Sequence, residues 1–158
     1  MRQACIGRRS VMHHLTYKRM LLEDDTDIPE LTAIHQTPEI AQYISISDNY
    51  FRYVTHNENV YFYKVYESNK LIGSTHLEKQ GTVLCMDILV FPAFQRTGLG
   101  TKILEDIQND VFGLNYERIQ ISIDEGNTAS LRLFQNAGFV CTSKENELIS
   151  FVYHTRAA

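Results

Sequence analysis

Short runs rich in β-branched and aromatic residues recur along the chain, and several alternate between apolar and polar positions. Such runs predict strands. They cover residues 15–22, 60–67, 71–78, 82–90, 118–123, 139–143 and 148–154. Only the polar turns 68–70 and 80–81 separate the second, third and fourth runs, so these are predicted to form an antiparallel meander. The last two runs flank a polar turn at 144–146 and predict a closing hairpin.

Other stretches show helical spacing. After residue 98, apolar residues recur every three or four positions and predict an amphipathic helix that runs to Phe112: Leu99, Ile103, Leu104, Ile107 and Val111. A second helix is predicted from Asn127, a favourable N-cap residue, to Gly138, which suits the left-handed position after a helix. Residues 27–34 begin with Asp-Ile-Pro-Glu and predict a third, capped helix, and residues 38–57 predict one or two short ones.

The order of these elements is strand, helices, three strands, helix, strand, helix and two strands, which predicts an α/β protein of the α+β type. The chain has 158 residues, 44% of them hydrophobic, and a chain of this size buries roughly 70% of its unfolded surface. We therefore expect one domain at residues 15–158. Residues 1–14 are interpreted as an N-terminal extension, either native or added ahead of an original start at Met12.

Charge and composition argue against several classes of protein. The formal net charge is −4 and Lys and Arg form no basic stripe, so nucleic-acid binding is not expected. The acidic balance suits an amine-bearing partner, and it equally serves solubility. No run of eighteen apolar residues predicts a membrane span, and the first nine residues lack the apolar region of a secretory signal. Three cysteines cannot all pair within one chain, so we expect a reduced, cytoplasmic protein, and no metal site is predicted.

A glycine loop joins a predicted strand to a predicted helix in the stretch Val90-Phe-Pro-Ala-Phe-Gln-Arg-Thr-Gly-Leu-Gly100. Gly98 and Gly100 let the backbone turn sharply and approach a ligand, while the free N–H groups and the positive dipole end of the helix face an anion. The junction therefore predicts a phosphate site. A Walker loop does not fit, because no Lys-Ser or Lys-Thr pair follows a glycine. A dinucleotide fingerprint does not fit either, because Ile103 stands where a third glycine or alanine is needed.

The loop reads Gln95-Arg-Thr-Gly-Leu-Gly100, and it resembles the Gln/Arg-x-x-Gly-x-Gly acetyl-CoA pyrophosphate loop of the GNAT superfamily of N-acetyltransferases. A second resemblance follows in Asn127-Thr-Ala-Ser-Leu-Arg-Leu-Phe-Gln-Asn-Ala-Gly-Phe139. It is similar to the family's Asn-x-x-Ala/Ser-x-x-Leu-Tyr/Phe-x-x-x-Gly-Phe segment. With both motifs in this order, between elements in the family's order, the chain is identified as a member of that superfamily.

The resemblance implies the GNAT fold, a mixed and mostly antiparallel sheet of six to seven strands with about four helices. It also implies that acetyl-CoA binds where strands 84–90 and 118–123 splay apart. The residues that it implies for the cosubstrate are Leu89, Val90, Gln95, Arg96, Thr97, Gly98, Leu99, Gly100, Thr101, Asn127, Ser130 and Phe134. A solvated loop position is the alternative for Arg96, and a plain helix cap is the alternative for Asn127.

Acetylation of an amine requires removal of a proton, because an alkyl amine has an ordinary pKa near ~10.4. Asp87 is the first candidate base, since it lies on the strand that leads to the loop, where some GNAT subfamilies use a carboxylate. Other members carry a glutamate three residues earlier, where this chain has Leu84. His76, on the preceding strand, titrates in the right range. The alternatives are a carboxylate satisfied by its neighbours and a histidine that packs on the strand surface.

Phe134 departs from the family pattern, which often has a tyrosine there to protonate the departing CoA thiolate. A phenylalanine ring can pack against the pantetheine or thioester end but donates no proton. Water, Tyr116, Tyr153 or Ser130 would then supply it. Because thiols have a pKa near ~8.5 and leave readily, we still expect an active enzyme.

Cys85 and Cys141 lie in apolar runs and have no partner histidine at a recognisable spacing. We expect both to be small buried side chains and not nucleophiles. Direct attack in a ternary complex is therefore favoured over a covalent acyl-cysteine route.

The expected function is thus transfer of an acetyl group from acetyl-CoA to a primary amine. The alternatives are a catalytically silent acyl-CoA-binding or regulatory domain and, less well matched to the loop, a nucleotide-binding module. The acceptor, a small molecule or a peptide, stays open among polyamines, amino acids, aminoglycoside-like amines and protein N-termini. Tyr50, Phe51 and Tyr53 are candidates for the wall of its site. An exposed edge at 148–154 is where a homodimer is expected to pair.

Overall fold

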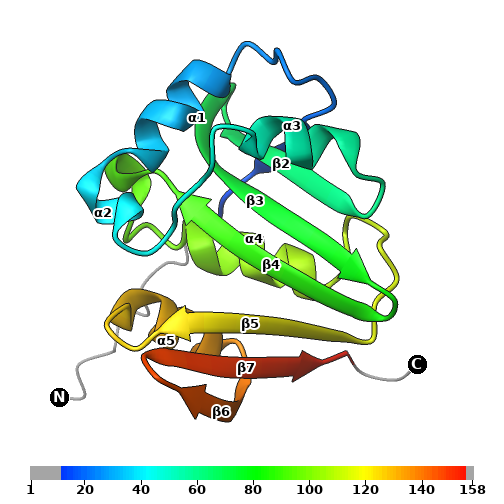
Figure 1. Cartoon of the computed structure of the whole chain (residues 1–158), viewed down its shortest axis with the longest axis vertical. Helices are drawn as coiled ribbons and strands as arrows, with labels where there is room; N and C mark the ends of the chain where they lie inside the picture. The colour runs from blue at the N-terminus through cyan, green and yellow to red at the C-terminus, as the bar shows by residue number, and fades with distance from the viewer. Residues whose placement is uncertain (1–11, 156–158) are drawn as a thin grey trace, which may run out of the picture.

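The computed structural model describes residues 12–155 and contains one seven-stranded sheet in the order β1-β2-β3-β4-β5-β7-β6 (Figure 1). The strands are β1 (Leu15–Arg19), β2 (Val60–Glu67), β3 (Lys70–Gln80), β4 (Val83–Val90), β5 (Arg118–Asp124), β6 (Val140–Glu145) and β7 (Leu148–His154). The helices in this range are α1 (Ile28–His35), α2 (Pro38–Ala41), α3 (Tyr50–His56), α4 (Leu99–Gln108) and α5 (Thr128–Asn136), with a 3-10 turn, η1 (Pro92–Phe94), after β4. The predicted order of elements is confirmed.

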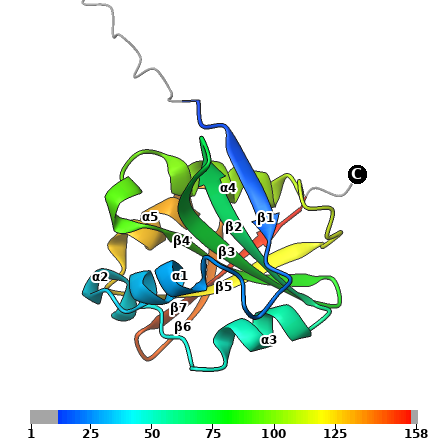
Figure 2. The same ribbon diagram turned by 90° about the horizontal axis from the view of Figure 1, so that it is seen from above.

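Helices cover both faces of the sheet. α1, α2 and α3 lie on one face, which we call the front face, and α4 and α5 lie on the other (Figures 1 and 2). Each layer has its own core. The front core contains buried residues of the first three helices, including Leu31 and Ile40, and the opposite core contains Ile103 of α4 and Phe134 of α5.

The sheet opens between β4 and β5. These strands run parallel and pair only at residues 83–85 with 118–120. Beyond that point β5 stays paired with β7 as far as Asp124, whereas the part of β4 that leads to Val90 pairs only with β3. The backbone groups on the free side of β4 therefore face a gap in the sheet, at the position where two strands were expected to splay apart.

α4 ends at Gln108 and not at Phe112. Asp110 adopts a left-handed φ of 49°, and its carboxylate accepts hydrogen bonds from the backbone N–H groups of Leu114 and Asn115 at 2.7 and 2.9 Å. This turn competes with a further helical turn. Val111 continues the apolar spacing but lies in the turn, where it is 55% exposed.

The C-terminal edge of the sheet is β6 and not β7. β7 lies between β5 and β6 and is paired on both sides, whereas every residue of β6 is exposed. The exposed edge expected at 148–154 therefore belongs to residues 140–145. Cys141 lies on this edge strand and is exposed, so the expectation that it is buried is wrong.

Asp27 stands at the N-cap position of α1 but makes no capping bond with its side chain. Its carboxylate accepts a hydrogen bond from Lys64 Nζ at 2.8 Å and another from the Tyr66 hydroxyl. Asp25 also binds Lys64, at 2.8 Å. The start of α1 is thus fastened to β2 by an ion-pair cluster and is not capped locally.

Most of the predicted extension 1–14 lies outside the described residues. His13, which lies in its described part, contacts Glu67 and the backbone of Thr97. In the range 12–155 no helix has the length and apolar character needed to cross a membrane.

Candidate functional site

A cavity of about 640 Å³ lies at the open end of β4 and extends between the starts of α4 and α5. Its walls come from segments far apart in the sequence: α2 and the residues after it, the last residues of β4, the glycine loop and the first turn of α4, and residues 126–136 around α5. The cavity therefore has walls from both parts of the split sheet.

The glycine loop has the geometry of an anion site. Arg96 and Gly98 adopt left-handed φ values of 63° and 84°, and α4 begins directly after Gly98. The Lys102 N–H is bonded to the Gly98 carbonyl at 3.1 Å, so the N–H groups of Leu99, Gly100 and Thr101 precede the first intrahelical bond. These donors and the dipole end of α4 meet at the cavity wall.

Side chains within the loop brace its backbone. The Gln95 amide donates to the Val90 carbonyl at 3.1 Å, and the Thr97 hydroxyl donates to the Phe94 carbonyl at 2.6 Å. The loop is thereby tied both to the end of β4 and to η1. Its shape is held in advance and needs no ligand to form it.

Most residues that the sequence implied for the cosubstrate line this one cavity. They are Leu89, Val90, Gln95, Arg96, Gly98, Leu99, Gly100, Thr101, Asn127 and Ser130. Thr97 lies in the loop but does not line the cavity. Phe134 is buried in the core behind it, with its ring 5.1 Å from that of Phe139, and Leu133 lines the cavity in its place.

α5 is terminated as its sequence suggests. The Asn127 side chain accepts a hydrogen bond from the Ser130 N–H at 3.3 Å, and Gly138 has a φ of 91°. The Phe139 N–H bonds to the Phe134 carbonyl at 3.1 Å, and the two rings are in contact. Asn127 therefore caps the helix and also lines the cavity.

Gly100 leaves room that a side chain would fill. A Cβ added there would lie 3.5 Å from Leu133 Cδ2 and 3.9 Å from Val90 Cγ2, and both of these residues line the cavity. These are ordinary van der Waals distances, so a methyl group at this position would contact the cavity wall without a clash. A cavity wall that combines this glycine with free N–H groups fits a ligand that carries a pyrophosphate.

The front face carries a polar cluster beside the opening of the sheet. Asp87 on β4 and His76 on β3 are directly opposite each other in the antiparallel pair. His76 Nδ1 lies 2.7 Å from the Tyr50 hydroxyl and its Nε2 lies 3.2 Å from Glu78 Oε2. The Tyr53 hydroxyl in turn donates to Glu78. We call these five residues the front cluster.

One assignment of protons satisfies the hydrogen bonds of His76. If the Tyr50 hydroxyl donates to Nδ1, then Nε2 carries the proton and donates to Glu78, so the ring is neutral. Burial, together with the negative charges of Asp87 and Glu78, raises the pKa of Tyr50 and keeps it a neutral donor. Both nitrogens of His76 are then engaged.

Asp87 combines two properties. Its side chain is open to solvent, yet its carboxylate is set among the strands, where partial loss of water raises its pKa above the ordinary value. The hydrogen bond from the His76 backbone N–H acts in the opposite direction. Because water still reaches the side chain, the loss of solvation is incomplete. Asp87 is thus a solvent-accessible carboxyl group with a raised pKa.

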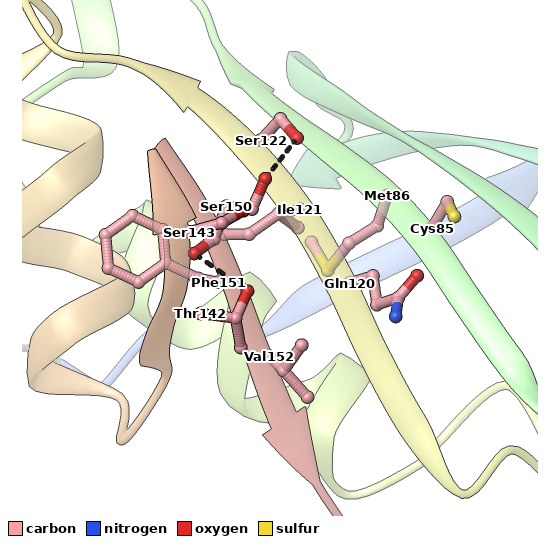
Figure 3. Close-up of a pocket in the computed structure, with 10 residues that line it drawn as sticks. All are labelled: Cys85, Met86, Gln120, Ile121, Ser122, Thr142, Ser143, Ser150, Phe151 and Val152. Carbon is pink, nitrogen blue, oxygen red and sulfur yellow. Dashed lines mark hydrogen bonds between the residues drawn. The ribbon is translucent and has the colours of Figure 1, made fainter. Parts of the chain in front are cut away.

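A second cavity of about 490 Å³ lies over β5, β7 and β6 next to the point where β4 and β5 separate (Figure 3). Its ten lining residues carry hydroxyl, amide, thiol and apolar groups and no charge: Cys85, Met86, Gln120, Ile121, Ser122, Thr142, Ser143, Ser150, Phe151 and Val152. Along β4, residues 85–86 line this cavity and residues 88–90 line the first. Asp87 lies between these residues along the strand and lines neither cavity.

Tyr43 is a site residue that the sequence analysis did not single out. Its hydroxyl donates to the Gly126 carbonyl at 3.1 Å, which joins the segment after α2 to the turn before α5 across the first cavity. The aromatic character of residues 43–53 was the signal available. Of the three aromatic residues named there, Tyr50 and Tyr53 belong to the front cluster, whereas Phe51 is buried in the core.

Two of the proton donors considered for the leaving thiolate lie elsewhere. The Tyr116 hydroxyl is buried and donates to the Ile107 carbonyl, and Tyr153 stacks on Phe139 at 5.3 Å. Neither lines a cavity described above, whereas Ser130 does. Sequence spacing could not separate these three hydroxyls, because only the packing of the rings decides which one reaches the cleft.

Cys85 is half-buried and lines the second cavity. Burial and the negative charge of Glu78 raise the pKa of its thiol, which keeps it protonated and unreactive. Cys5 lies outside the described residues. In the part of the chain that the structure describes, no group of three or more His, Cys, Asp or Glu side chains could hold a metal ion.

A family model described as the acetyltransferase (GNAT) family matches residues 22–139, a range that includes the glycine loop and the Asn127 to Phe139 segment. No curated protein sequence matches the chain. Several solved structures are similar to it in fold.

Spermidine N-acetyltransferase from Vibrio cholerae, in complex with CoA and spermine, has a TM-score of 0.75 at 15% identity, over 89% of this chain and 95% of its own. The ribosomal-protein-S18-alanine N-acetyltransferase from Escherichia coli has a TM-score of 0.73 at 17% identity, over 92% and 96%. N-acetyltransferase PseH from Campylobacter jejuni, in complex with acetyl coenzyme A, has a TM-score of 0.73 at 12% identity, over 90% and 100%. At these identities the likeness concerns the fold.

Proposed function

The chain belongs to the acetyltransferase (GNAT) family, and from this premise we propose that it transfers the acetyl group of acetyl-CoA to a primary amine by direct attack in a ternary complex. Family membership makes it an acetyl-CoA-dependent acetyltransferase. The amine, the route and the residue roles are the proposal.

One observation carries the proposal: the glycine loop at the start of α4 and the unpaired end of β4 line the same cavity. The N–H groups of residues 99–101 are suited to the pyrophosphate, and the backbone groups on the unpaired side of β4, at residues 88–90, are suited to the amides of pantetheine. The Arg96 side chain adds a positive charge beside them. The thioester at the end of the pantetheine arm would then reach the gap between β4 and β5.

Asp87 is proposed as the general base. It lies between the residues of β4 that line the two cavities, is open to solvent, and has a pKa raised toward the range in which a base works near neutral pH. His76 is proposed to act beside it, with its ring positioned by Tyr50 and Glu78. Because both nitrogens of His76 are engaged, Asp87 is the stronger of the two candidates for proton removal.

Acetyl-CoA supplies a thioester whose carbonyl the neutral amine attacks, and the CoA thiol leaves with a proton. The cavity wall offers the hydroxyls of Tyr43 and Ser130 for that proton, besides water. The protonated, half-buried Cys85 argues for direct attack over an acyl-cysteine route.

The second cavity is proposed to hold the rest of the acceptor. The carboxylates of Asp87 and Glu78 attract an ammonium group, whereas the uncharged hydroxyl and amide lining suits a neutral chain with hydrogen-bonding groups. This favours amino sugars and peptide N-termini over simple diamines. The similar structures named above are, by their titles, acetyltransferases of a polyamine and of a protein alanine, so both small molecules and peptides belong in the screen.

A catalytically silent acyl-CoA-binding domain is the second candidate, favoured by phenylalanine at position 134 where the family often has a tyrosine. It predicts binding of acetyl-CoA without release of thiol.

We also propose a reduced, cytoplasmic setting, which the free thiols of Cys85 and Cys141 support, and pairing of two copies along β6 as a homodimer. Sedimentation that shows only monomer would remove the dimer.

The test begins with calorimetric titration of acetyl-CoA, with ATP and NAD as controls, followed by a thiol-release assay over a panel of amines. We expect binding of acetyl-CoA alone and thiol release with at least one amine. No binding of acetyl-CoA would overturn the use of the loop. Binding without release by any amine, at pH values on both sides of neutrality, would favour the silent domain.

A further inference from the structure

We propose that His13 is a positioning residue for the acetyl-CoA loop, and that it acts as an imidazolium that ties Thr97 of the loop to Glu67 at the end of β2. The inference rests on the proposed use of the loop for pyrophosphate. It concerns a residue that stands before the first strand, in a segment that the sequence analysis treated as an extension.

The contacts of His13 require two donors. Its Nδ1 lies 2.7 Å from Glu67 Oε2, and its Nε2 lies 2.7 Å from the carbonyl oxygen of Thr97. A carboxylate and a carbonyl oxygen only accept hydrogen bonds, so both ring nitrogens must carry protons. The argument applies to His13 and not to His76, because one neighbour of His76 is a hydroxyl that can either donate or accept.

The surroundings support this state. The His13 side chain is only 8% exposed, and its bond to Glu67 is partly buried. The bond to the Thr97 backbone and the nearby Glu67 raise the pKa of His13, and burial opposes them. Other charged groups on the elements that meet here are Lys70, opposite Glu67 on β3, and Arg96 in the loop. Lys70 lies over the Phe94 ring, at 4.8 Å from its centroid, and His14 beside His13 is exposed.

The bond reaches the part of the loop that defines its shape. Thr97 lies between Arg96 and Gly98, the two left-handed residues, and its own hydroxyl is bonded to the Phe94 carbonyl. A Cβ added to Gly98 would lie 3.8 Å from His13 Nε2. The imidazolium therefore fixes the peptide that enters α4 and places a positive charge beside the loop. Both effects favour an anion at the N–H groups of residues 99–101.

The test measures acetyl-CoA affinity against pH for the wild type, His13→Ala, His13→Gln and Glu67→Gln, with His14→Ala as the matched control. At pH 6 we expect His13→Ala to weaken binding by about 3- to 10-fold, the range for the loss of one ordinary hydrogen bond. That ratio should shrink as pH rises through the pKa of His13, because the neutral ring keeps only one of its two bonds. Glu67→Gln should move this midpoint to lower pH, and His14→Ala should behave as the wild type.

A purely structural role would weaken binding equally at every pH, which would overturn the proposal. A second measurement does not depend on the variants: the ring nitrogens of His13 in the wild type, observed by NMR, should both be protonated at pH 6 and titrate above the ordinary value of ~6.5. A neutral ring there would also overturn it. If the wild type itself does not bind acetyl-CoA, the proposed function fails instead.

Discussion

Asp87 is the residue on which the proposed chemistry depends, and the same property that suits it to the chemistry costs stability. Its raised pKa means that the folded protein holds a proton at this carboxyl more tightly than the unfolded chain does. Stability from this group is therefore present below its ordinary pKa of ~3.9 and is lost as pH rises through the higher folded value. At neutral pH the charged carboxylate therefore destabilises the fold.

Asp87→Asn should consequently separate activity from stability. We expect the rate of thiol release at neutral pH to fall by about 10²- to 10⁴-fold, the usual range for a general base, with acetyl-CoA affinity unchanged. The melting temperature at pH 7 should rise, and the difference from the wild type should vanish as pH falls below ~4. Glu125→Gln, which alters an exposed acid paired with Lys144, is the control. Equal activity of the two variants across pH would remove Asp87 from the site.

The two loop glycines should respond differently to alanine, although the sequence treats them alike. Gly98 has a left-handed φ, so an alanine there is strained by about 1–2 kcal/mol. Gly100 is helical and has ordinary contacts around an added Cβ, so stability should change by less than about 1 kcal/mol. Both variants should weaken the binding of acetyl-CoA by about tenfold or more, because each alters the loop that presents the N–H groups of residues 99–101.

Gly113→Ala is the matched control for this pair. Gly113 has a φ of 69° and lies outside both cavities, with no atom within 4 Å of an added Cβ. It should share the strain of Gly98→Ala, measured by denaturant unfolding, and keep the affinity of the wild type. If Gly98→Ala loses stability but binds acetyl-CoA normally, the loop does not hold the pyrophosphate.

At the scale of elements, a buried ion-pair cluster positions the helices that line the cavity. Lys64 on β2 is almost fully buried and reaches both Asp25 and Asp27 at 2.8 Å, before the start of α1. α1 leads into α2, whose Glu39 and Ile40 line the first cavity. These contacts lower the pKa of Asp27, so its contribution to stability is present above the ordinary value of ~3.9 and is lost as pH falls through the lower folded value.

Removal of the lysine should loosen this end of the molecule. We expect Lys64→Ala to lower the free energy of unfolding by about 2–3 kcal/mol at pH 7, since it leaves two partly buried carboxylates without their partner. The loss should be smaller at pH 3, where the carboxyls take up protons. Lys144→Ala removes an exposed ion pair and should cause no measurable change in urea unfolding. Equal midpoints for both variants at pH 7 would show that the cluster does not anchor α1.

The sequence predicts an element correctly where one local pattern decides its structure. β2 lies at the predicted residues because its run is bounded by clear turns, and Gly138 ends α5 because its left-handed conformation is a local requirement. Prediction from the sequence fails where other groups compete with the local pattern for the same residue. Asp27 looks like a cap but binds Lys64, and Asp110 diverts the chain although Val111 continues the apolar spacing. A hairpin pattern does not indicate which of its two strands forms the edge of the sheet. The edge was expected at β7, but the edge strand is β6.

The same distinction holds for the site. The glycine loop and Asn127 belong to contiguous motifs, and most of the residues of these motifs that were expected at the cosubstrate line one cavity, with the exceptions of Thr97 and Phe134. Tyr43, His13 and the network of Tyr50 with His76 depend on contacts between residues far apart in the chain, and no spacing signals them. Phe134 occupies a motif position, yet the direction of its ring is set by packing against Phe139.

At the scale of the whole molecule, the sheet consists of two parts that share only the short contact of β4 with β5. One part carries the glycine loop and the other carries α5, and the first cavity has walls from both. A ligand that fills this cavity therefore joins the two parts, with Tyr43 and Gly126 as a bond already present between them. Binding should therefore raise the stability of the whole fold.

Hydrogen exchange with and without acetyl-CoA tests this idea. We expect protection in two separate segments, residues 88–101 and 126–136, and little change in β1 or in the exposed strand β6. At a ligand concentration of 100 times Kd the gain in stability is about 2.7 kcal/mol, which corresponds to a rise in melting temperature of roughly 5–10 °C. Gly113→Ala should show the same rise and Gly98→Ala a smaller one. Protection confined to residues 88–101 would mean that the ligand does not reach α5, and the assignment of Asn127 and Ser130 to the cosubstrate site would then be wrong.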